Sequence, residues 1–339
     1  MEEFDIIIVG ASFAGLAVAS ELKSNVLLLD RKDIGTNVTS ACGTIVKFVE
    51  SIRLEKSILQ TFDAATLHTA KNKIHHIPLA DEFCTIDYSI FCNQFFKQSD
   101  AEFRKENVSG LKEGAIITDK RKYKAKIYVD CSGWSAILAS SIDKRFVDKK
   151  KLSVAIETEI PYKDNKLRFF VDEKIIENGM GWLFPAGENS RLGVGSYGKN
   201  PRLMQSLKNF VSSYGLKLNG AHGNYIPHYL RKPTIDNIFV VGDAAGNVLP
   251  LTVEGIRPAI RAGKYCGRIA QQIIEGKISL EEGSRRYSYF CLKNKKYYDY
   301  LLKAQRRMSH SPNWKLNFVT KFLSMKPIAK WALKKYEAI

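Results

Sequence analysis

The stretch FDIIIVGASFAGLAVASEL, residues 4–22, decides the fold together with VLLLD at residues 26–30. Residues 4–9 form an apolar run rich in β-branched side chains, which predicts a parallel strand buried on both faces. Residues 16–22 have helical composition, and residues 26–29 form a second apolar run. Strand, glycine turn, helix and strand make a βαβ unit of about thirty residues.

The turn of this unit has the residues that a phosphate-binding turn requires. Gly10 allows the tight turn and Gly15 allows close packing of the helix on the strand, while Ser12 occupies the place of a middle glycine. The N-terminus of the helix offers free N–H groups to a pyrophosphate. Asp30 follows the turn by about twenty residues, where a carboxylate accepts hydrogen bonds from a ribose. The pattern predicts dinucleotide binding; the alternative is a glycine-rich strand–helix junction that binds nothing.

Length and composition limit the class of protein. A chain of 339 residues is long enough for two domains, or for one domain with a large insertion. No apolar run reaches the roughly 18 residues of a membrane span. The acidic start enters a strand at once, which predicts no signal peptide and a cytoplasmic protein. The six cysteines are scattered without a zinc-like spacing, so we expect free thiols and no metal site.

The net charge of +17 is unevenly distributed along the chain. Residues 285–339 contain fourteen Lys or Arg against two acidic residues, a net charge of +12. No nucleic-acid-binding signature accompanies this charge, so we expect no nucleic-acid partner. An anionic membrane surface or a phosphorylated substrate fits the charge as well as a solvated basic face does.

The remaining chain predicts two interleaved domains. Residues 44–62 look helical, residues 64–86 look like a hairpin, and residues 151–198 alternate as antiparallel strands. We therefore expect a first domain at 1–62, 87–150 and 225–280, a second domain at 63–86 and 151–224, and a basic helical region at 281–339.

Two further strands end in turns of small residues with a carboxylate. The strand before Asp130 leads into a turn that contains Gly133, and the strand at residues 238–241 leads into Gly242 and Asp243. A loop with Pro250 then reaches a predicted helix that runs to about residue 274.

These three motifs, in this order, resemble the FAD-binding family that includes p-hydroxybenzoate hydroxylase and geranylgeranyl reductase. The resemblance implies an α/β fold: a Rossmann-like FAD-binding domain, an inserted antiparallel-sheet substrate domain and a helical C-terminus. It implies FAD as cofactor, with NAD(P)H or a ferredoxin as the unidentified external reductant. The cofactor-binding residues that it implies are Gly10, Ser12, Ala14, Gly15, Asp30, Arg31, Cys42, Gly43, Val108, Asp130, Gly133, Gly242, Asp243, Pro250, Gly255 and Ile256.

Two of these positions have a physical role in such a site. Asp243 would accept hydrogen bonds from the ribityl hydroxyls of the flavin. The helix that starts after Gly255 would direct its N–H groups at the flavin O2 and stabilise the anionic reduced flavin. The alternative for this segment is an ordinary strand, loop and helix.

Within the family, two stretches resemble the geranylgeranyl reductase branch: Cys42–Gly43, and GWLFP at residues 181–185 with LGVG at residues 192–195. Trp182 and Phe184 alternate along a strand, so both face one side. An apolar wall of this kind suits an isoprenoid chain, and a core-facing aromatic pair is the alternative. Cys42 is a candidate proton donor or substrate gate, or a structural thiol. Tyr88 departs from the pattern, since many relatives have an arginine there.

The resemblance predicts an FAD-dependent reductase of C=C bonds in geranylgeranyl chains, with Cys42, Trp182 and Phe184 as the candidate substrate site. Reduced flavin would deliver hydride from N5 to the alkene. The basic C-terminus would hold the enzyme on the inner face of the membrane, and a protein is a possible electron donor. An FAD monooxygenase acting on a hydrophobic substrate and a flavin electron carrier without a substrate are the rivals. A plain NAD(H) dehydrogenase fits less well, because it would leave the late Gly-Asp motif without a role.

Overall fold

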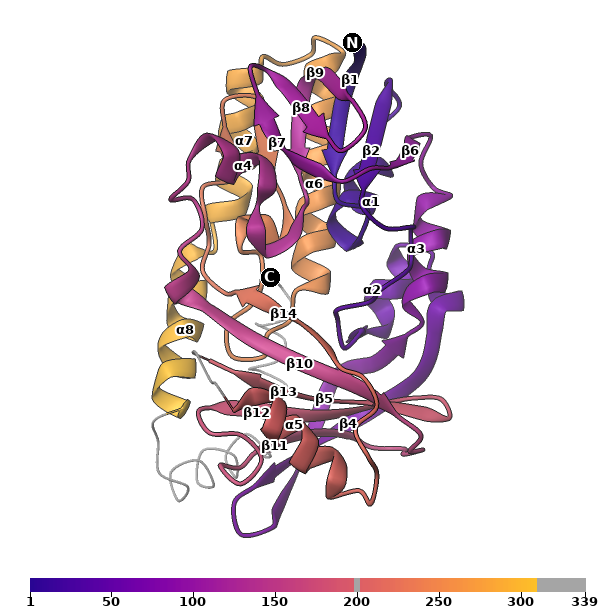
Figure 1. The fold of residues 1–339 in the computed structure, drawn as a ribbon, viewed down its shortest axis with the longest axis vertical. Coiled ribbons are helices and arrows are strands. Elements are labelled where there is room, and N and C mark those ends of the chain that lie inside the picture. The colour runs from indigo at the N-terminus through magenta and orange to yellow at the C-terminus, as the bar shows by residue number, and fades with distance from the viewer. Residues whose placement is uncertain (198–201, 310–339) are drawn as a thin grey trace. The chain divides into compact units, whose positions relative to one another are not determined.

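The computed structural model describes residues 1–197 and 202–309 of the chain and divides into two compact units (Figure 1). The first unit comprises Met1–Val38, Tyr88–Lys151 and Pro227–Leu302. The second comprises Thr39–Asp87, Leu152–Ile226 and the described residues from 303 onward. Both units are built from segments far apart in the sequence.

The first unit is organised around a sheet with the strand order β15-β16-β9-β1-β2-β6. Its strands are β1 (Glu2–Val9), β2 (Val26–Asp30), β6 (Glu102–Lys105), β9 (Lys122–Asp130), β15 (Thr234–Ile235) and β16 (Ile238–Val240). Every neighbouring pair is parallel except β15 with β16. Three successive isoleucines of β1, residues 6–8, are completely buried, as expected for a central strand.

Helices and a short meander complete this unit. The helices are α1 (Phe13–Ala19), α3 (Tyr88–Phe96), α4 (Ile137–Ile142), α6 (Ile256–Ile274), α7 (Leu280–Leu292) and α8 (Lys295–Ser309), with the 3₁₀ turns η2 (Gly133–Ser135), η3 (Lys149–Lys151) and η4 (Gly242–Ala245). Strands β7 (Val108–Lys112) and β8 (Ala115–Thr118) form a meander with β9. Helices α1 and α6 pack together, and Glu21 pairs with Lys264 and Arg268 across that contact.

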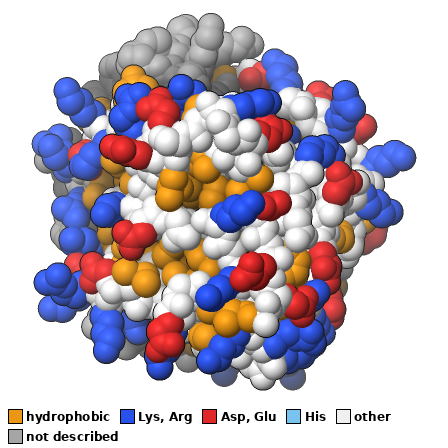
Figure 2. Space-filling model, turned by 90° about the horizontal axis from the view of Figure 1, so that it is seen from above, with side chains coloured by type: hydrophobic (Ala, Val, Ile, Leu, Met, Phe, Trp, Pro, Cys, Tyr) orange, Lys and Arg blue, Asp and Glu red, His pale blue; other side chains and the backbone are white. Residues whose placement is uncertain are grey.

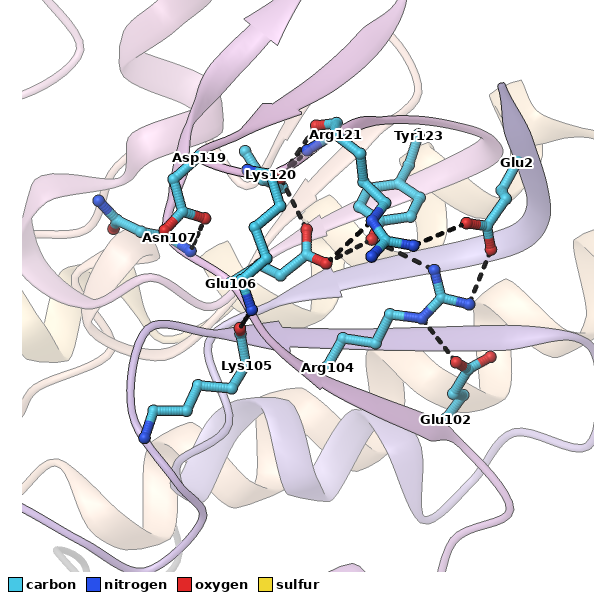
Figure 3. Close-up of polar contacts among 11 residues, drawn as sticks. Glu2, Glu102, Arg104, Lys105, Glu106, Asn107, Asp119, Lys120, Arg121 and Tyr123 are labelled. Atoms are coloured by element: carbon cyan, nitrogen blue, oxygen red, sulfur yellow. Dashed lines mark hydrogen bonds and ion pairs between the residues drawn. The ribbon is translucent and has the colours of Figure 1, made fainter.

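A network of charged side chains ties the meander to the parallel strands (Figure 3). The buried carboxylate of Glu106 accepts hydrogen bonds from Tyr123 Oη at 2.7 Å and Thr118 Oγ1 at 2.7 Å. Arg104 lies between Glu2 and Glu102, with N–O distances of 2.7 and 2.6 Å. The network is satisfied within the protein, so we assign it a structural role.

The second unit is a sheet with the strand order β14-β10-β13-β12-β11-β4-β5-β3. Its strands are β3 (Gly43–Ile45), β4 (Ile58–Thr69), β5 (Lys73–Ile86), β10 (Leu152–Ile160), β11 (Leu167–Val171), β12 (Gly179–Ala186), β13 (Asn189–Ser196) and β14 (His222–Pro227). Helix α5 (Leu203–Ser212) lies against β10–β13 (Figure 1). Leu207, Phe210 and Val211 of α5 form a core with Leu183, Leu192 and Val194 of the sheet.

Two of the predicted assignments are wrong. Residues 44–62 were expected to be helical, but only α2 (Val46–Ser51) and the 3₁₀ turn η1 (Glu55–Ser57) are, and β4 starts at Ile58. Pairing with the long strand β5 decides the conformation here, from Ile58 opposite Ile86 onward. Residues 39–62 also belong to the second unit rather than the first, since β3 pairs with β5.

The predicted C-terminal region does not stand apart where the structure describes it. Helix α7 and the part of α8 up to Leu302 belong to the first unit, and Tyr287 donates a hydrogen bond to the carbonyl oxygen of Val240 at 2.8 Å. The rest of that region, residues 310–339, lies outside the described residues. Among the described helices, none has the length and apolar character needed to span a bilayer. On the face drawn in Figure 2, Lys and Arg side chains alternate with acidic ones.

Candidate functional site

Three turns meet at one edge of the sheet in the first unit. Strands β1, β9 and β16 are parallel neighbours, with Val9 opposite Asp130 and Asp130 opposite Val240. Their carboxyl ends therefore lie side by side, and the turns that follow start from the same edge. In open α/β sheets, ligands bind outside the carboxyl ends of the strands.

The first two turns are in direct contact at Gly10. This residue has φ +108°, and a Cβ there would lie 2.2 Å from the carbonyl oxygen of Cys131. The amide of Cys131 donates to the Val9 carbonyl at 2.8 Å, and the amide of Gly10 donates to the Leu29 carbonyl at 2.8 Å. A side chain at residue 10 would separate the two turns, so glycine is required for their approach.

Asp30, at the end of β2, supports the glycine turn. Its carboxylate accepts from the amide of Ala11 at 2.7 Å and from the amide of Lys32 at 3.1 Å. Ser12 Oγ lies 2.9 Å from Tyr88 Oη, so the serine that replaces the middle glycine is joined to α3. The unusual residues Ser12 and Tyr88 therefore form one hydrogen-bonded pair.

Asp130 uses its carboxylate to accept hydrogen bonds within its own turn. Its carboxylate is fully buried and accepts from Ser132 Oγ at 2.5 Å, the amide of Ser132 at 3.1 Å and the amide of Ala139 at 2.9 Å. Burial raises the pKa of Asp130, and these hydrogen bonds oppose the rise. The carboxylate holds the 131–139 turn in shape.

Asp243, in the third turn, is the acid left for a ligand. Among the described residues, no donor forms a hydrogen bond with its side chain. Burial raises the pKa of Asp243 to about 6, and the positive charge of Arg231 opposes this rise. The carboxylate lies at the start of α6, because a Cβ on Gly255 would be 3.5 Å from Asp243 Oδ1. A half-buried carboxylate without a protein donor fits a ligand with hydroxyl groups.

The loop that leads to α6 is under backbone strain. Leu251 and Val253 have φ values of +79° and +59°, and positive φ is unfavourable for bulky or β-branched side chains. The amide of Leu249 donates to the Glu254 carbonyl at 2.8 Å, which closes the loop. Pro250 lies within this loop, and Ile256 is the first residue of α6.

The other predicted cofactor residues of the first unit are distributed around these turns. Ala14 and Gly15 lie on α1, Arg31 follows Asp30, and Gly133 begins η2. Val108 differs from these residues because its side chain is buried in the hydrophobic core of the unit, with Phe4 and Tyr123.

Cys42 and Gly43 belong to the second unit. The thiol of Cys42 is fully buried, and burial raises its pKa to about 11 although the charge of Arg191 opposes the rise. Arg191 donates to the carbonyl oxygens of Ala41 at 3.0 Å and Ile86 at 3.2 Å, which fixes this segment. Gly43 packs against the rings of Phe83 and Phe184. Cys42 therefore keeps its proton at neutral pH.

Trp182 and Phe184 lie in one aromatic cluster of this unit. Phe184 packs edge-on against Phe169 and Phe83, with ring centroids 5.3 and 6.0 Å apart. Phe62, Phe169 and Trp182 belong to the same cluster. Both predicted residues thus belong to one apolar cluster, in which Phe62 and Phe184 are buried and Phe169 and Trp182 are half-buried.

Trp182 is held flat on the sheet by a buried carboxylate. Its Nε1 donates to Glu157 Oε2 at 3.1 Å, and His222 Nε2 lies 3.0 Å from Glu157 Oε1. Gly193 stands between Glu157 and Trp182 in the strand register, and a Cβ there would lie 2.1 Å from the indole ring. The indole therefore crosses above Gly193 to reach the carboxylate.

Sequence reasoning missed Glu157, Arg191, His222 and Arg231. Glu157 is a buried polar residue on β10, and its burial is not visible from the alternating pattern of the segment. The pair of glycines in LGVG was a usable signal, because a glycine within a strand marks close approach of another group. Across the described residues, no cluster of His, Cys, Asp and Glu is suited to bind a metal ion.

No protein-family model matches the chain. The fold is nevertheless that of FAD-dependent oxidoreductases. A geranylgeranyl bacteriochlorophyll reductase-like protein from Thermoplasma acidophilum superposes with a TM-score of 0.85 at 17% identity, over 96% of this chain and 92% of that one. PqsL from Pseudomonas aeruginosa, described as a probable FAD-dependent monooxygenase, has a TM-score of 0.70 at 14% identity, over 91% and 97% of the chains.

In sequence, the chain is similar to digeranylgeranylglycerophospholipid reductases. It is 24% identical to reductase 3 of Methanosphaera stadtmanae over 326 residues, 85% of this chain and 82% of the relative. It is 23% identical to the enzyme of Methanocaldococcus jannaschii over 348 residues, 88% of this chain and 84% of the relative. These similarities confirm the predicted fold and the resemblance to geranylgeranyl reductases.

The contact between Trp182 and Gly193 generates a testable prediction. Gly193→Ala adds a methyl group that would overlap sterically with the indole ring of Trp182. We therefore expect the free energy of unfolding, measured in urea titrations, to fall by about 1–3 kcal/mol. Gly195→Ala is the matched control, because its Cβ would lie 3.5 Å from Trp182, an ordinary contact. Equal stability of the two variants would contradict the assigned position of the indole.

Proposed function

We propose that the chain is an FAD-dependent reductase that saturates C=C bonds in the prenyl chains of a lipid or of its precursor. The observation that carries the proposal is the aromatic cluster around Trp182 and Phe184, which adjoins the Cys42–Gly43 segment. An isoprenoid chain requires an extended apolar wall with few polar groups. The names of the relatives, digeranylgeranylglycerophospholipid reductases, support the same class of substrate.

The residues at the sheet edge of the first unit fit FAD. Asp243 would accept from ribityl hydroxyls, and its carboxylate has no donor among the described residues. Asp30 would accept from the adenosine ribose, although two backbone amides already use part of its capacity. The amides at the start of α6, after Gly255, would face the flavin O2, where the helix dipole stabilises negative charge.

Bound FAD would supply the hydride, from N5 of its reduced form. The protein would position the alkene and exclude water, because an isolated alkene is a poor hydride acceptor. Glu157 would fix the plane of Trp182, so that the apolar wall keeps one shape. The buried thiol of Cys42 holds a proton at neutral pH, which is compatible with a proton donor and with a structural role.

The similarity to PqsL supports a second candidate, an FAD monooxygenase acting on a hydrophobic substrate. Such an enzyme would consume O2 and release an oxygenated product or hydrogen peroxide. We favour the reductase because the similarity to the reductase-like structure is closer, at a TM-score of 0.85 against 0.70.

The first prediction of this proposal concerns the reaction itself. The purified flavoprotein is reduced under anaerobic conditions, and a geranylgeranyl lipid is then added. We expect the flavin absorbance to return as each alkene is reduced, with a product heavier by about two mass units per bond, since each reduction adds one hydride and one proton. A saturated analogue of the lipid is the control. Flavin that stays reduced until air enters would instead indicate the monooxygenase or an electron carrier.

The second prediction concerns Asp243 and pH. Its raised pKa, about 6, means that acidification through this value protonates the carboxylate in the protein without ligand. Hydroxyl donors favour the ionised form, so we expect the affinity for FAD to fall as the pH drops below about 6. Flavin fluorescence titrations measure this.

Asp243→Asn should bind FAD more weakly and lose the pH dependence, because an amide does not titrate in this range. Asp63→Asn, at an exposed position, should behave like the wild type. The same acid-induced loss of affinity in Asp243→Asn would assign the titration to another group.

The third prediction concerns the membrane. The basic C-terminal region would hold the enzyme on anionic lipid, where each Lys or Arg near the surface adds about 1 kcal/mol. We expect replacement of four cations by Glu to abolish cosedimentation with vesicles that contain phosphatidylserine. The four are Arg306, Arg307, Lys334 and Lys335.

A control with the same change of charge separates this effect from the net charge. Four exposed lysines far from that region in sequence are replaced by Glu: Lys71, Lys73, Lys112 and Lys124. This variant should retain most of its binding, and an equal loss in both variants would contradict a specific role of the C-terminal region. The electron donor, NAD(P)H or a ferredoxin, is open in this proposal.

A further inference from the structure

Arg231 joins two of the three turns in the first unit. The side chain is 5% exposed, and its Nη1 donates to the carbonyl oxygens of Trp134 at 2.8 Å and Ala244 at 3.1 Å. Its own amide donates to the carbonyl oxygen of Ala245 at 2.9 Å. One edge of the guanidinium thus connects the turn after β9 with the turn after β16.

The other edge of this guanidinium has no partner. Nε and Nη2 are both buried, and neither forms a hydrogen bond with any described residue. Within the described part of the chain, Arg231 also forms no ion pair. Asp243 is close enough for the charge of Arg231 to lower its pKa, without direct contact between the two groups. A buried cation with two unused donors is unfavourable unless a ligand satisfies it.

The two unused donors have the geometry of an oxyanion site. The Nε and Nη2 protons of a guanidinium point in the same direction and bind two oxygens of a phosphate or a carboxylate at once.

Two lysines lie over the rings of residues that contact Arg231. The guanidinium carbon of Arg231 lies 5.2 Å from the ring centroid of Tyr229, and Lys151 Nζ lies 5.6 Å from the same ring. Lys149 Nζ lies 5.9 Å from the ring of Trp134. Among the described residues, Asp148 pairs with Lys151 at 3.4 Å. Asp243 is the second carboxylate close to Arg231, so the three cations exceed the two acids by one, which favours an anion.

We propose that the free edge of Arg231 binds a phosphate group. Two sources have this chemistry: the pyrophosphate of FAD, and a second phosphorylated ligand such as a lipid head group. The anion site rests on the geometry of the protein, and only its assignment to the cofactor rests on the proposed function.

The experiment compares the wild-type protein with Arg231→Lys. The lysine keeps the positive charge and can still donate to a carbonyl oxygen, but it lacks the two parallel N–H donors of Nε and Nη2. Inorganic pyrophosphate is titrated by calorimetry into the flavoprotein and into protein freed of FAD. We expect at least about a tenfold loss of pyrophosphate affinity in Arg231→Lys, because hydrogen bonds to a charged group are lost. Lys232→Gln, at the exposed neighbouring position, removes a charge without touching this edge and should change little.

The two protein forms distinguish the source. Binding by the FAD-free form alone, together with weaker FAD binding by Arg231→Lys, assigns the site to the cofactor pyrophosphate. Binding by both forms assigns it to a second ligand. Wild-type protein that binds no pyrophosphate in either form, or Arg231→Lys that binds it equally well, overturns the proposal. Should Arg231→Lys not fold, thermal unfolding of the wild type decides: pyrophosphate must raise the midpoint above that in chloride at equal ionic strength.

Discussion

The parallel register of β1, β9 and β16 is the constraint on which the candidate site depends. Because Val9, Asp130 and Val240 lie in one row, the three turns that follow begin at the same edge. Gly10 then lets the first two turns touch, with no room for a Cβ beside the Cys131 carbonyl. A shift of the register by one residue would reverse the direction of every side chain in the row and separate the turns. Candidate cofactor residues more than two hundred positions apart in sequence are therefore brought together by backbone hydrogen bonds.

In the second unit, a hydrogen bond to Glu157 fixes Trp182 within the aromatic cluster. Trp182 and Glu157 are separated by β13, so the indole reaches the carboxylate only because Gly193 lies beneath it. The carboxylate in turn contacts His222 on β14. The row of Glu157, Gly193 and Trp182 across the sheet thus combines a hydrogen-bonding carboxylate with an aromatic ring. An anchored ring loses less conformational entropy when a flexible chain packs against it.

The sequence predicted most of this where the signal was local. The apolar run before Gly10, the helix at 256–274 and the alternation around Trp182 were each visible in a short window. The helical prediction for residues 44–62 failed because pairing with β5, more than twenty residues further along the chain, decides where β4 begins. Glu157 and Arg231 were missed for the same reason. Their roles depend on partners from other strands and turns, and no periodicity in the chain reveals such contacts.

The use of hydrogen-bonding capacity separates the structural residues from the candidate ligand-binding ones. Asp130 accepts three hydrogen bonds from its own turn, and Glu106 is satisfied by Tyr123 and Thr118, so neither needs a ligand. One edge of Arg231 is buried without a partner among the described residues, which is costly, and the half-buried carboxylate of Asp243 accepts no hydrogen bond from them. Opposite charges left near one another without pairing indicate that a ligand with both hydroxyl and anionic groups completes the site. A flavin nucleotide has both, a polyol chain next to a pyrophosphate, and this agreement of chemistry is independent of any resemblance in sequence.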